Sequence, residues 1–315
     1  MSIRVLPGGK IVAKSIMDFV KKPGLLFISL GHRGWFHHMD DEKYLKIAYY
    51  SKMGKKLNLT NPRTYNEKLQ WMKLYDRKPV YTDMVDKYEA KKIAAKMIGE
   101  EYIIPTLGVW EKFEDIDFDQ LPDQFVLKCT HDSGGLVICK DKKTFNKDSA
   151  RKKIERCMKH NFFWGQREWP YKNVRPRIIA EQYMEDPITK DLRDYKFFAF
   201  NGDVKALFIA TERGSAEETK FDFFDAEFNH LAFTNGHPNA KITPDKPQCF
   251  EEMKRLAGIL SRGLPQIRID LYEVNGKVYF GEFTFFHWSG FMPFVPEQWD
   301  YTFGDWILLP DRSTQ

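Results

Sequence analysis

The hydrophobic and polar positions of this chain follow two different periods. Residues 1–60 and 64–98 place apolar side chains three or four positions apart, which predicts helices in the first third of the chain. The remainder is dominated by short apolar or alternating runs between polar, glycine-containing turns, which predicts strands. The predicted strands are 102–110, 125–129, 136–140, 178–184, the two arms of 191–213, the pair in 221–233 and the two arms of 267–285, with further helices at 145–160 and 248–263.

Local signals mark where several of these elements begin, turn and end. Thr64 and Glu67 have the spacing of a capping box at a helix N-terminus. Gly54 follows a helical pattern and is expected to end that helix. The Asn-Gly dipeptide at 201–202 is expected to turn a hairpin.

Residues 267–290 hold the most informative polar side chains of the chain. They read as two strands joined by the Asn-Gly dipeptide at 275–276, which suits a two-residue hairpin turn. Alternation along the second arm is expected to place Val278, Phe280 and Glu282 on one face.

Three charged side chains of this hairpin form a candidate site. Asp270 on the first arm and Glu282 on the second are expected to be neighbours, with the cation Arg268 close by. Two carboxylates on a rigid sheet suit Mg²⁺, which takes few carboxylates and keeps its other positions for water and substrate phosphates. The alternative is an exposed hairpin that carries scattered charges.

A second candidate site lies in residues 125–140. A strand that carries Lys128 near its end leads into a small polar loop, 130–135, and then into another strand. Glycines allow such a loop to bring backbone N–H groups onto a phosphate, and Ser133 adds a hydroxyl donor. The loop is not a Walker A motif, because no helix with Gly-Lys-Ser/Thr follows it. The alternative is an ordinary hairpin.

Three further charged residues stand out by position. Glu181 lies inside an apolar strand, where a carboxylate needs a partner. Lys196 lies on the first arm of the 191–213 hairpin. Lys91 falls four residues after Lys87 in a predicted helix, so both are expected on one helix face.

Composition narrows the class of protein. The chain has 315 residues, of which 43% are hydrophobic and 15% aromatic, typical of a folded globular protein. A net charge of +5 is a mild excess, compatible with anionic substrates, and no basic segment indicates nucleic-acid binding. Four cysteines without CxxC spacing are expected to be reduced thiols. We find no signal peptide and no spanning apolar segment, which favours a cytoplasmic protein.

Five segments, taken in order, resemble the TupA-like ATP-grasp proteins of bacterial cell-surface polysaccharide biosynthesis. The resemblance runs from about residue 40 to about residue 310. The segments are NPRTYNEKLQWMKLYD (61–76), DKYEAKK (86–92), LKCTHDSGG (127–135), RDYKFFAFNG (193–202) and RIDLYEVNGKVYFGEFTF (268–285).

The resemblance implies an α+β fold of the ATP-grasp type. A nucleotide would be clamped between two α+β subdomains that follow a helical N-terminal region. The implied domains are a basic helical region 1–60, an N-terminal α/β part 61–115, a lid subdomain with the glycine loop 116–184 and a C-terminal subdomain with the Mg²⁺ site 185–315.

The resemblance also assigns roles around the nucleotide. Lys128 and Lys91 would contact phosphates, and the loop 130–135 would close over them. Glu181 would accept from the adenine amino group, and Glu185 or Asp191 would hold the ribose. The full nucleotide-binding set is Lys91, Lys128, His131, Ser133, Gly134, Gly135, Glu181, Gln182, Met184 and Asp191.

The remaining roles concern the reacting groups. Asp270 and Glu282 would bind Mg²⁺, together with Thr284, which stands where the superfamily often has Asn. Lys196 would reach the γ-phosphate, and Arg268 would stabilise the phosphorylated carboxylate. The segment that follows, where the superfamily often has Pro-Gly, here carries His287 and Trp288.

The implied activity is an ATP- and Mg²⁺-dependent carboxylate–amine ligase that forms an acyl phosphate. The expected substrate is a uronic acid of a capsular or teichuronic-type glycan, coupled to an amino acid or another amine. No nucleic-acid partner is expected, and the resemblance is compatible with peripheral association with a membrane polysaccharide assembly system. Two alternatives are a glycosyltransferase of the same polymer and a nucleotide-binding assembly protein without turnover.

Overall fold

The computed structural model describes residues 5–6, 10–11, 23–186, 192–212 and 218–311. The chain forms two compact units, each assembled from separate stretches of sequence. Unit 1 comprises Met1–Leu57, Arg77–Ala90 and Ile104–Tyr183. Unit 2 comprises Asn58–Asp76, Lys91–Ile103 and Met184–Gln315. The four consecutive domains expected from the sequence stay a prediction.

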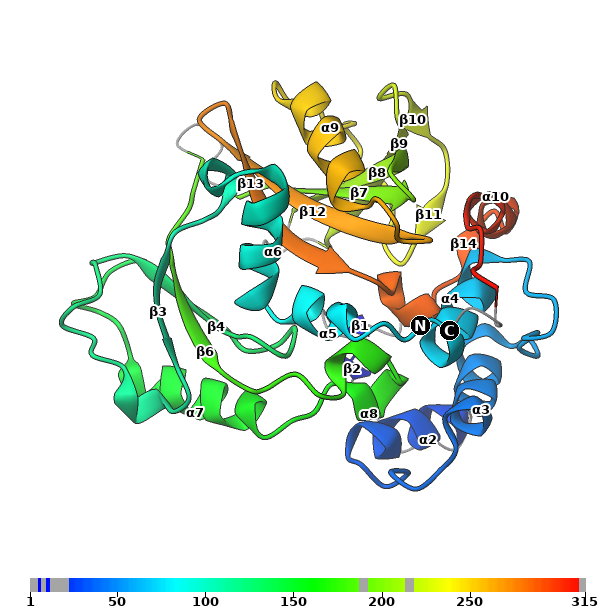
Figure 1. The fold of residues 1–315 in the computed structure, drawn as a ribbon, viewed down its shortest axis with the longest axis horizontal. Helices are drawn as coiled ribbons and strands as arrows, with labels where there is room; N and C mark the ends of the chain where they lie inside the picture. Colours follow the sequence, from blue (N-terminus) through cyan, green and yellow to red (C-terminus); the bar gives the residue numbers. More distant parts are fainter. Residues whose placement is uncertain (1–4, 7–9, 12–22, 187–191, 213–217, 312–315) are drawn as a thin grey trace. The chain divides into compact units, whose positions relative to one another are not determined.

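Unit 2 is built on a six-stranded antiparallel sheet in the order β10-β9-β8-β7-β12-β13 (Figure 1). Helix α9 (Phe250–Leu260) covers one face, where the ring centroids of Phe250 and Phe197 lie 6.1 Å apart. The strands are β7 (Asp194–Phe200), β8 (Asp203–Thr211), β9 (Lys220–Asp225), β10 (His230–Leu231), β12 (Ile267–Val274) and β13 (Lys277–Thr284).

Both predicted Asn-Gly hairpins are confirmed. Residues 201–202 join β7 to β8, and residues 275–276 join β12 to β13. All four turn residues have positive φ, between 49° and 93°, which Asn and Gly tolerate at little cost. The turns therefore fix where each strand pair starts.

The pairing of β12 with β13 corrects one prediction about faces. Leu271 lies opposite Phe280, but Asp270 lies opposite Glu282, so Gly281 is an extra residue that forms a bulge. Glu282 therefore leaves the face of Val278 and Phe280 and joins the face of Asp270. A Cβ on Gly281 would lie 2.8 Å from the Asp270 carbonyl oxygen, which explains why glycine occupies the bulge.

Two further helices of unit 2 contact each other. Helix α4 (Tyr65–Tyr75) begins with the predicted capping box. Its Asn66 binds the Asp300 carboxylate of α10 (Gln298–Trp306) through backbone and side chain, at 3.0 and 2.9 Å. The other elements are α6 (Glu89–Ile98, shared between the units), η1 (Glu100–Tyr102), β11 (Thr234–Asn235), η4 (His287–Gly290) and β14 (Phe294–Val295).

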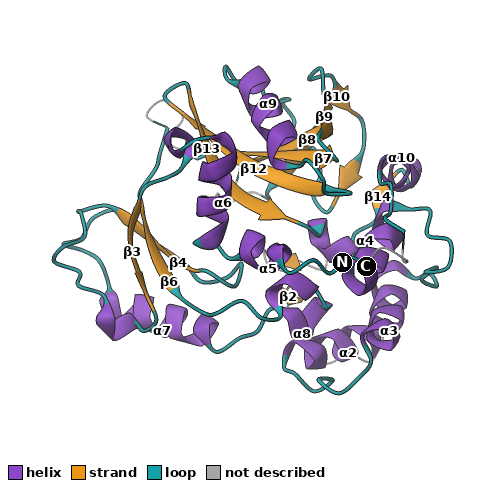
Figure 2. Cartoon of the chain, viewed as in Figure 1, coloured by secondary structure: helices purple, strands orange, loops and turns teal. Residues whose placement is uncertain are grey.

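Unit 1 contains a four-stranded antiparallel sheet in the order β3-β6-β4-β5. One face and helix α7 (Lys147–Met158) enclose a hydrophobic core, which includes Phe125, Leu127 and Ile154 (Figures 1 and 2). The strands are β3 (Thr106–Trp110), β4 (Phe125–Cys129), β5 (Leu136–Cys139) and β6 (Ile178–Gln182).

The first part of unit 1 is only partly helical, which corrects the prediction for residues 1–60. Residues 5–6 and 10–11 form a two-residue strand pair, and the sequence between them, Pro-Gly-Gly, is unfavourable in a helix. Gly54 ends α3 as predicted, with φ 69°. The helices are α2 (Pro23–His32), α3 (Asp41–Met53), α5 (Val80–Val85) and α8 (Phe163–Gln166). The paired strands are β1 (Val5–Leu6) and β2 (Lys10–Ile11), and two short 3-10 helices are η2 (Phe113–Asp115) and η3 (Trp169–Tyr171).

Two composition-based expectations concern the whole chain. All four cysteines are free thiols, three of them buried, which agrees with the expected reduced state. No helix within the described ranges is long and apolar enough to cross a membrane.

Candidate functional site

The predicted site residues fall into two groups, one in each unit. In unit 1, residues of the sheet that point away from the α7 core define what we call the second sheet face. Lys128 lies opposite Leu136 and Ile179, and Val126 lies opposite Ile138 and Glu181. On β4, β5 and β6, the second sheet face therefore carries Val126, Lys128, Leu136, Ile138, Ile179 and Glu181.

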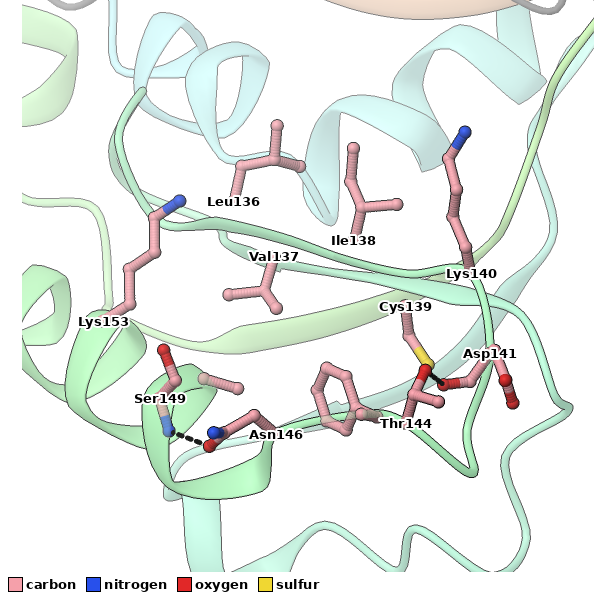
Figure 3. Close-up of a pocket in the computed structure, with 12 residues that line it drawn as sticks. Leu136, Val137, Ile138, Cys139, Lys140, Asp141, Thr144, Asn146, Ser149 and Lys153 are labelled. Carbon is pink, nitrogen blue, oxygen red and sulfur yellow. Dashed lines mark hydrogen bonds between the residues drawn. The ribbon is translucent and has the colours of Figure 1, made fainter.

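Figure 3 shows this alternation along the edge strand β5. Leu136 and Ile138 point to one side, whereas Val137 and Cys139 point to the other, toward α7. Leu136 and Ile138 are 40% and 50% exposed, unusual for large aliphatic side chains. A groove of about 570 Å³ runs beside β5 and the first turn of α7. The second sheet face thus offers apolar surface next to a lysine.

Lys128 and Glu181 form an ion pair across neighbouring strands. Their Nζ and Oε2 atoms lie 2.5 Å apart, and the glutamate side chain is only 7% exposed. This pairing supplies the partner that a buried carboxylate requires. The lysine that was expected to bind phosphate and the glutamate that was expected to bind adenine are therefore neighbours on one sheet face. Their roles toward a nucleotide stay predictions.

The glycine loop between β4 and β5 is held by the residues around it. The Asp132 carboxylate accepts a hydrogen bond from the Gly135 backbone N–H at 2.9 Å. The side chain of Lys87 donates to the Asp132 carbonyl, and the backbone N–H of Lys87 donates to the Thr130 carbonyl at 3.0 Å. A Cβ on Gly135 would lie 2.7 Å from the Cβ of Cys129, so this position requires glycine. Only the tip, Ser133 and Gly134, is exposed.

His131 anchors this loop to the end of α7. Its Nε2 lies 3.2 Å from the Cys157 carbonyl oxygen and 3.1 Å from that of His160, so Nε2 carries the proton. The side chain is 3% exposed, and burial lowers its pKa, which keeps the ring neutral. The ring of His131 thus packs the loop against α7, and a role of His131 toward a nucleotide stays a prediction.

The remaining predicted nucleotide-binding residues are Lys91, Gln182, Met184 and Asp191. Gln182 ends β6, where its N–H donates to the Pro105 carbonyl at 3.0 Å, and its side chain is exposed. Met184 follows and is half-buried, while Lys91 is buried on α6. Asp191 lies outside the described residues.

The second group lies in unit 2, on the sheet face opposite α9. Lys196 of β7 and Glu282 of β13 both lie opposite Asp270 of β12, and Arg268 lies opposite Thr284. We call these five residues the charge cluster. The bulge at Gly281 is what brings Glu282 into the cluster.

Hydrogen bonds tie the charge cluster together through Asp270. Arg268 binds both oxygens of the Asp270 carboxylate, Nε to Oδ1 at 2.7 Å and Nη2 to Oδ2 at 2.8 Å. Lys196 donates to the same Oδ2 and lies 3.4 Å from Asp194. The hydroxyl of Thr284 accepts from Arg268 Nη2 at 3.0 Å and donates to Glu282 at 3.4 Å.

Burial and charge set the protonation states of the cluster. Burial opposes ionisation of Asp270, but Arg268 and Lys196 outweigh it and hold the pKa of this carboxyl at about 2. Burial lowers the pKa of Lys196, which the Asp270 carboxylate partly offsets. Asp270 raises the pKa of Arg268 against the effect of burial. The cluster is thus a charged network with one fully buried anion.

The charge cluster supplies some, but not all, of the ligands that a magnesium ion requires. Asp270 and Glu282 are neighbours, and the Glu282 side chain is 41% exposed, so its carboxylate is accessible. Within the described ranges, no group of three His, Cys, Asp or Glu residues could hold a metal. This donor set matches Mg²⁺ that completes its shell with water and phosphate. Binding would require Asp270 to release one of its present donors.

Three residues gain a place in the sites from the structure: His287 and Lys87, which the sequence had named without a role there, and Asn235, which it had not named. His287 is buried and lies 2.8 Å from Arg268 Nη1, and Asn235 lies 2.9 Å from the other ring nitrogen of His287. No local signal links Asn235 to a hairpin that begins more than thirty residues later. Lys87, which holds the glycine loop, lies in a segment that the sequence had singled out, at the position four before Lys91.

Comparison with known proteins places the chain in a family. Residues 67–308 match the family model TupA-like ATPgrasp. The chain belongs to the TupA-like ATPgrasp family, within the ATP-grasp superfamily. This confirms the predicted family and the predicted α+β fold of ATP-grasp type. No curated protein sequence matches the chain significantly.

The solved structures that the chain resembles are distant in sequence. D-alanine–D-alanine ligase from Bacillus anthracis, complexed with ATP, is 16% identical, with a TM-score of 0.39 over 64% of this chain and 54% of that chain. L-amino acid ligase from Bacillus licheniformis is 12% identical, with a TM-score of 0.44 over 78% and 55%. The chain spans about half the length of these ligases.

Proposed function

We propose that this protein is an ATP-dependent carboxylate–amine ligase that acts through an acyl phosphate. The observation that carries the proposal is the charge cluster, in which two neighbouring carboxylates, Asp270 and Glu282, share a sheet face with Arg268 and Lys196. Membership of the TupA-like ATPgrasp family supports the reaction class.

The unit 1 residues would bind the nucleotide. The second sheet face supplies apolar surface for a base, and Lys128 can exchange its contact with Glu181 for one with phosphate. The exposed tip of the glycine loop presents Ser133 and Gly134, whose backbone N–H groups can donate to phosphate oxygens. Asp270 and Glu282 would hold Mg²⁺, together with Thr284 if its hydroxyl rotates toward the ion. The ion would offset the charge of the triphosphate.

The reaction needs positioning and charge stabilisation from the protein, with no nucleophilic side chain. A substrate carboxylate oxygen attacks the γ-phosphorus of ATP, and ADP leaves, giving an acyl phosphate. An amine then attacks the acyl carbon, an amide forms, and phosphate leaves with the former carboxylate oxygen. Lys196 would neutralise the γ-phosphate, and Arg268 would stabilise the oxyanion at the acyl carbon.

We propose a uronic acid as the carboxylate substrate, within the synthesis of a capsular or teichuronic-type polysaccharide. The family resemblance supports this setting, and the amine would be an amino acid or another primary amine. A cytoplasmic location, at or near the inner membrane face, would suit such a reaction.

Trapping of the acyl phosphate tests this function. The full chain is incubated with Mg·ATP, hydroxylamine and either D-glucuronate or D-galacturonate, and ADP and hydroxamate are measured. We expect both products in equal amounts, and none with D-glucose, which lacks the carboxylate. ADP formation that is independent of the sugar acid would contradict the proposal. His230→Gln is a matched control, because His230 pairs with Asp222 on the opposite face of the same sheet.

A further inference from the structure

Nearly all hydrogen-bond donors of Arg268 are already used within unit 2. The guanidinium has five N–H groups, and the side chain is 9% exposed. Nε and Nη2 bind Asp270, the second Nη2 hydrogen binds Thr284 at 3.0 Å, and Nη1 binds His287 Nδ1 at 2.8 Å. Counted over the residues that the structure describes, one hydrogen on Nη1 therefore remains for a substrate oxygen.

The contact with Arg268 fixes the tautomer of His287. Arginine can only donate, so Nδ1 of His287 must be the acceptor, and the ring proton lies on Nε2. Nε2 donates in turn to Asn235 Oδ1 at 2.9 Å. The amide of Asn235 is itself oriented, because its NH₂ group donates to the carbonyls of Met292 and Pro293, both at 3.2 Å.

The ring of His287 is also fixed by packing. The ring meets Phe198 edge-on, with the ring centroids 5.1 Å apart, and its centroid lies 5.3 Å from that of Phe208. Both phenylalanines lie on the sheet face that carries the charge cluster. The residue is buried, and burial together with Arg268 lowers its pKa well below the usual value. A neutral ring beside a guanidinium is the state that these surroundings favour.

The backbone that carries His287 is held in an uncommon conformation. Trp288 and Ser289 both have left-handed φ, 48° and 57°, which is unfavourable for residues other than glycine. Two buried side chains of α4 secure this turn. Lys73 donates to the Ser289 carbonyl and hydroxyl, both at 2.8 Å, and Gln70 donates to the carbonyls of Ser289 and Gly290. Such backbone conformations persist when surrounding contacts hold them, and they are found most often at functional sites.

We propose that His287 is a positioning residue that, braced by Asn235, holds the one remaining Nη1 hydrogen of Arg268 in place for an oxyanion of the substrate carboxylate or its phosphorylated form. This inference rests on the proposed ligase function, because it assigns Arg268 to the acyl centre. We call the chain of contacts Arg268–His287–Asn235 the relay. Neither His287 nor Asn235 touches the substrate, so both act only by fixing the direction of the Arg268 guanidinium.

The first test is independent of any substrate. Nitrogen-15 NMR of the histidine rings at pH 7.5, with His287 assigned by comparison with His287→Asn, reports which ring nitrogen carries the proton. We expect a neutral ring protonated at Nε2 only. A ring protonated at Nδ1, or at both nitrogens, overturns the relay whatever the enzyme catalyses.

The second test separates the two halves of the relay. His287→Asn keeps an acceptor near the position of Nδ1, whereas His287→Gln keeps a donor near the position of Nε2 and loses the acceptor for Arg268. Hydroxamate formation is measured with the better of D-glucuronate and D-galacturonate, giving kcat and KM for the sugar acid and for ATP. His230→Gln is the control.

We expect His287→Gln to lower kcat about 100-fold with unchanged KM for ATP, because misdirection of a single oxyanion donor has an effect of this size. His287→Asn should retain kcat within about 10-fold, a rescue that a merely structural role would not produce. Equal losses in both variants, or none in either, overturn the proposal. If the wild-type protein forms no hydroxamate, the proposed function fails, and the tautomer measurement decides the relay.

Discussion

The two groups of site residues differ in how their charges are arranged. On the second sheet face of unit 1, the ion pair Lys128–Glu181 lies among aliphatic side chains, and the lysine side chain is 23% exposed. In the charge cluster of unit 2, Asp270 is fully buried and both its oxygens accept hydrogen bonds from cations. The first arrangement can exchange a partner easily, whereas the second is held in one geometry before any ligand binds.

The difference indicates that binding a ligand and stabilising a reaction require different arrangements of charged side chains. A partly exposed lysine gains little from its ion pair and can move to another anion. A buried network is strongly destabilised when one member is lost, because the others are left without partners in a medium of low polarity. The comparison can therefore be tested by removing charges from each group.

The largest expected effect is on stability, from Asp270→Asn. The variant leaves the buried Arg268 and Lys196 without their shared carboxylate, which we expect to lower the free energy of unfolding by roughly 3–5 kcal/mol. Glu282→Gln is the matched control, because this carboxylate is 41% exposed, and we expect a loss below about 1 kcal/mol. Urea unfolding measures both. Equal losses would mean that the charge cluster is no more rigid than a surface pair.

The same network predicts a dependence of stability on pH. The pKa of Asp270 is about 2 in the folded protein, below that of an ordinary carboxyl, so the folded state resists protonation more than the unfolded state. Its contribution, roughly 2 kcal/mol, is present above pH 4 and is lost as the pH falls toward 2. Unfolding of the wild type and of Asp270→Asn is compared at each pH. Parallel curves would contradict the assignment.

In unit 1 we expect a smaller effect from packing. Gly135→Ala places a Cβ 2.7 Å from that of Cys129 and should lower the free energy of unfolding by roughly 1–2 kcal/mol. Gly134→Ala, whose Cβ would meet no atom closer than 3.6 Å, should change it by less than about 0.5 kcal/mol. Thermal unfolding of the two variants decides the matter, and similar midpoints would show that the loop can relax.

The smallest expected change in free energy concerns nucleotide binding by Lys128. Lys128→Met should weaken ATP binding roughly 10-fold, because one phosphate contact of a charged side chain is lost. Lys152→Met, on the face of α7 opposite its buried residues, is the control and should leave the affinity unchanged. Isothermal titration calorimetry with Mg·ATP measures both. An unchanged affinity in Lys128→Met would remove Lys128 from the nucleotide site.

The sequence predicted those features that depend on neighbouring residues. The capping box of Thr64 and Glu67, the helix end at Gly54 and the two Asn-Gly turns are local signals, because each needs only a few consecutive residues. The positions of β4 and α9 follow from apolar runs of suitable length. The family assignment followed from motifs in the correct order.

The sequence could not predict the bulge at Gly281. Regular pairing from the 275–276 turn would have placed Glu282 opposite Ile269, on the α9 face of the sheet. The extra residue turns Glu282 toward Asp270, and a single glycine in a strand is only a weak signal for this. The proposed metal pair therefore depends on an irregularity that alternation alone would miss.

Contacts between distant segments were also out of reach. Asn235 and His287 are 52 residues apart, and Gln70 and Lys73 bind the turn that carries His287 from more than 200 residues away. These contacts exist only because α4, η4 and the sheet pack together in unit 2. Periodicity describes single elements and gives no information on such packing.

The ligase reaction itself is tested most directly by the fate of a carboxylate oxygen. D-Glucuronate and D-galacturonate, labelled with oxygen-18 in the carboxylate, are incubated with the protein, Mg·ATP and a primary amine, and the released phosphate is analysed by mass spectrometry. Transfer of one labelled oxygen from the carboxylate to each phosphate is the expected result, because the acyl phosphate passes that oxygen on. Phosphate that carries no label, released by attack of water on ATP, would contradict the reaction proposed for this protein.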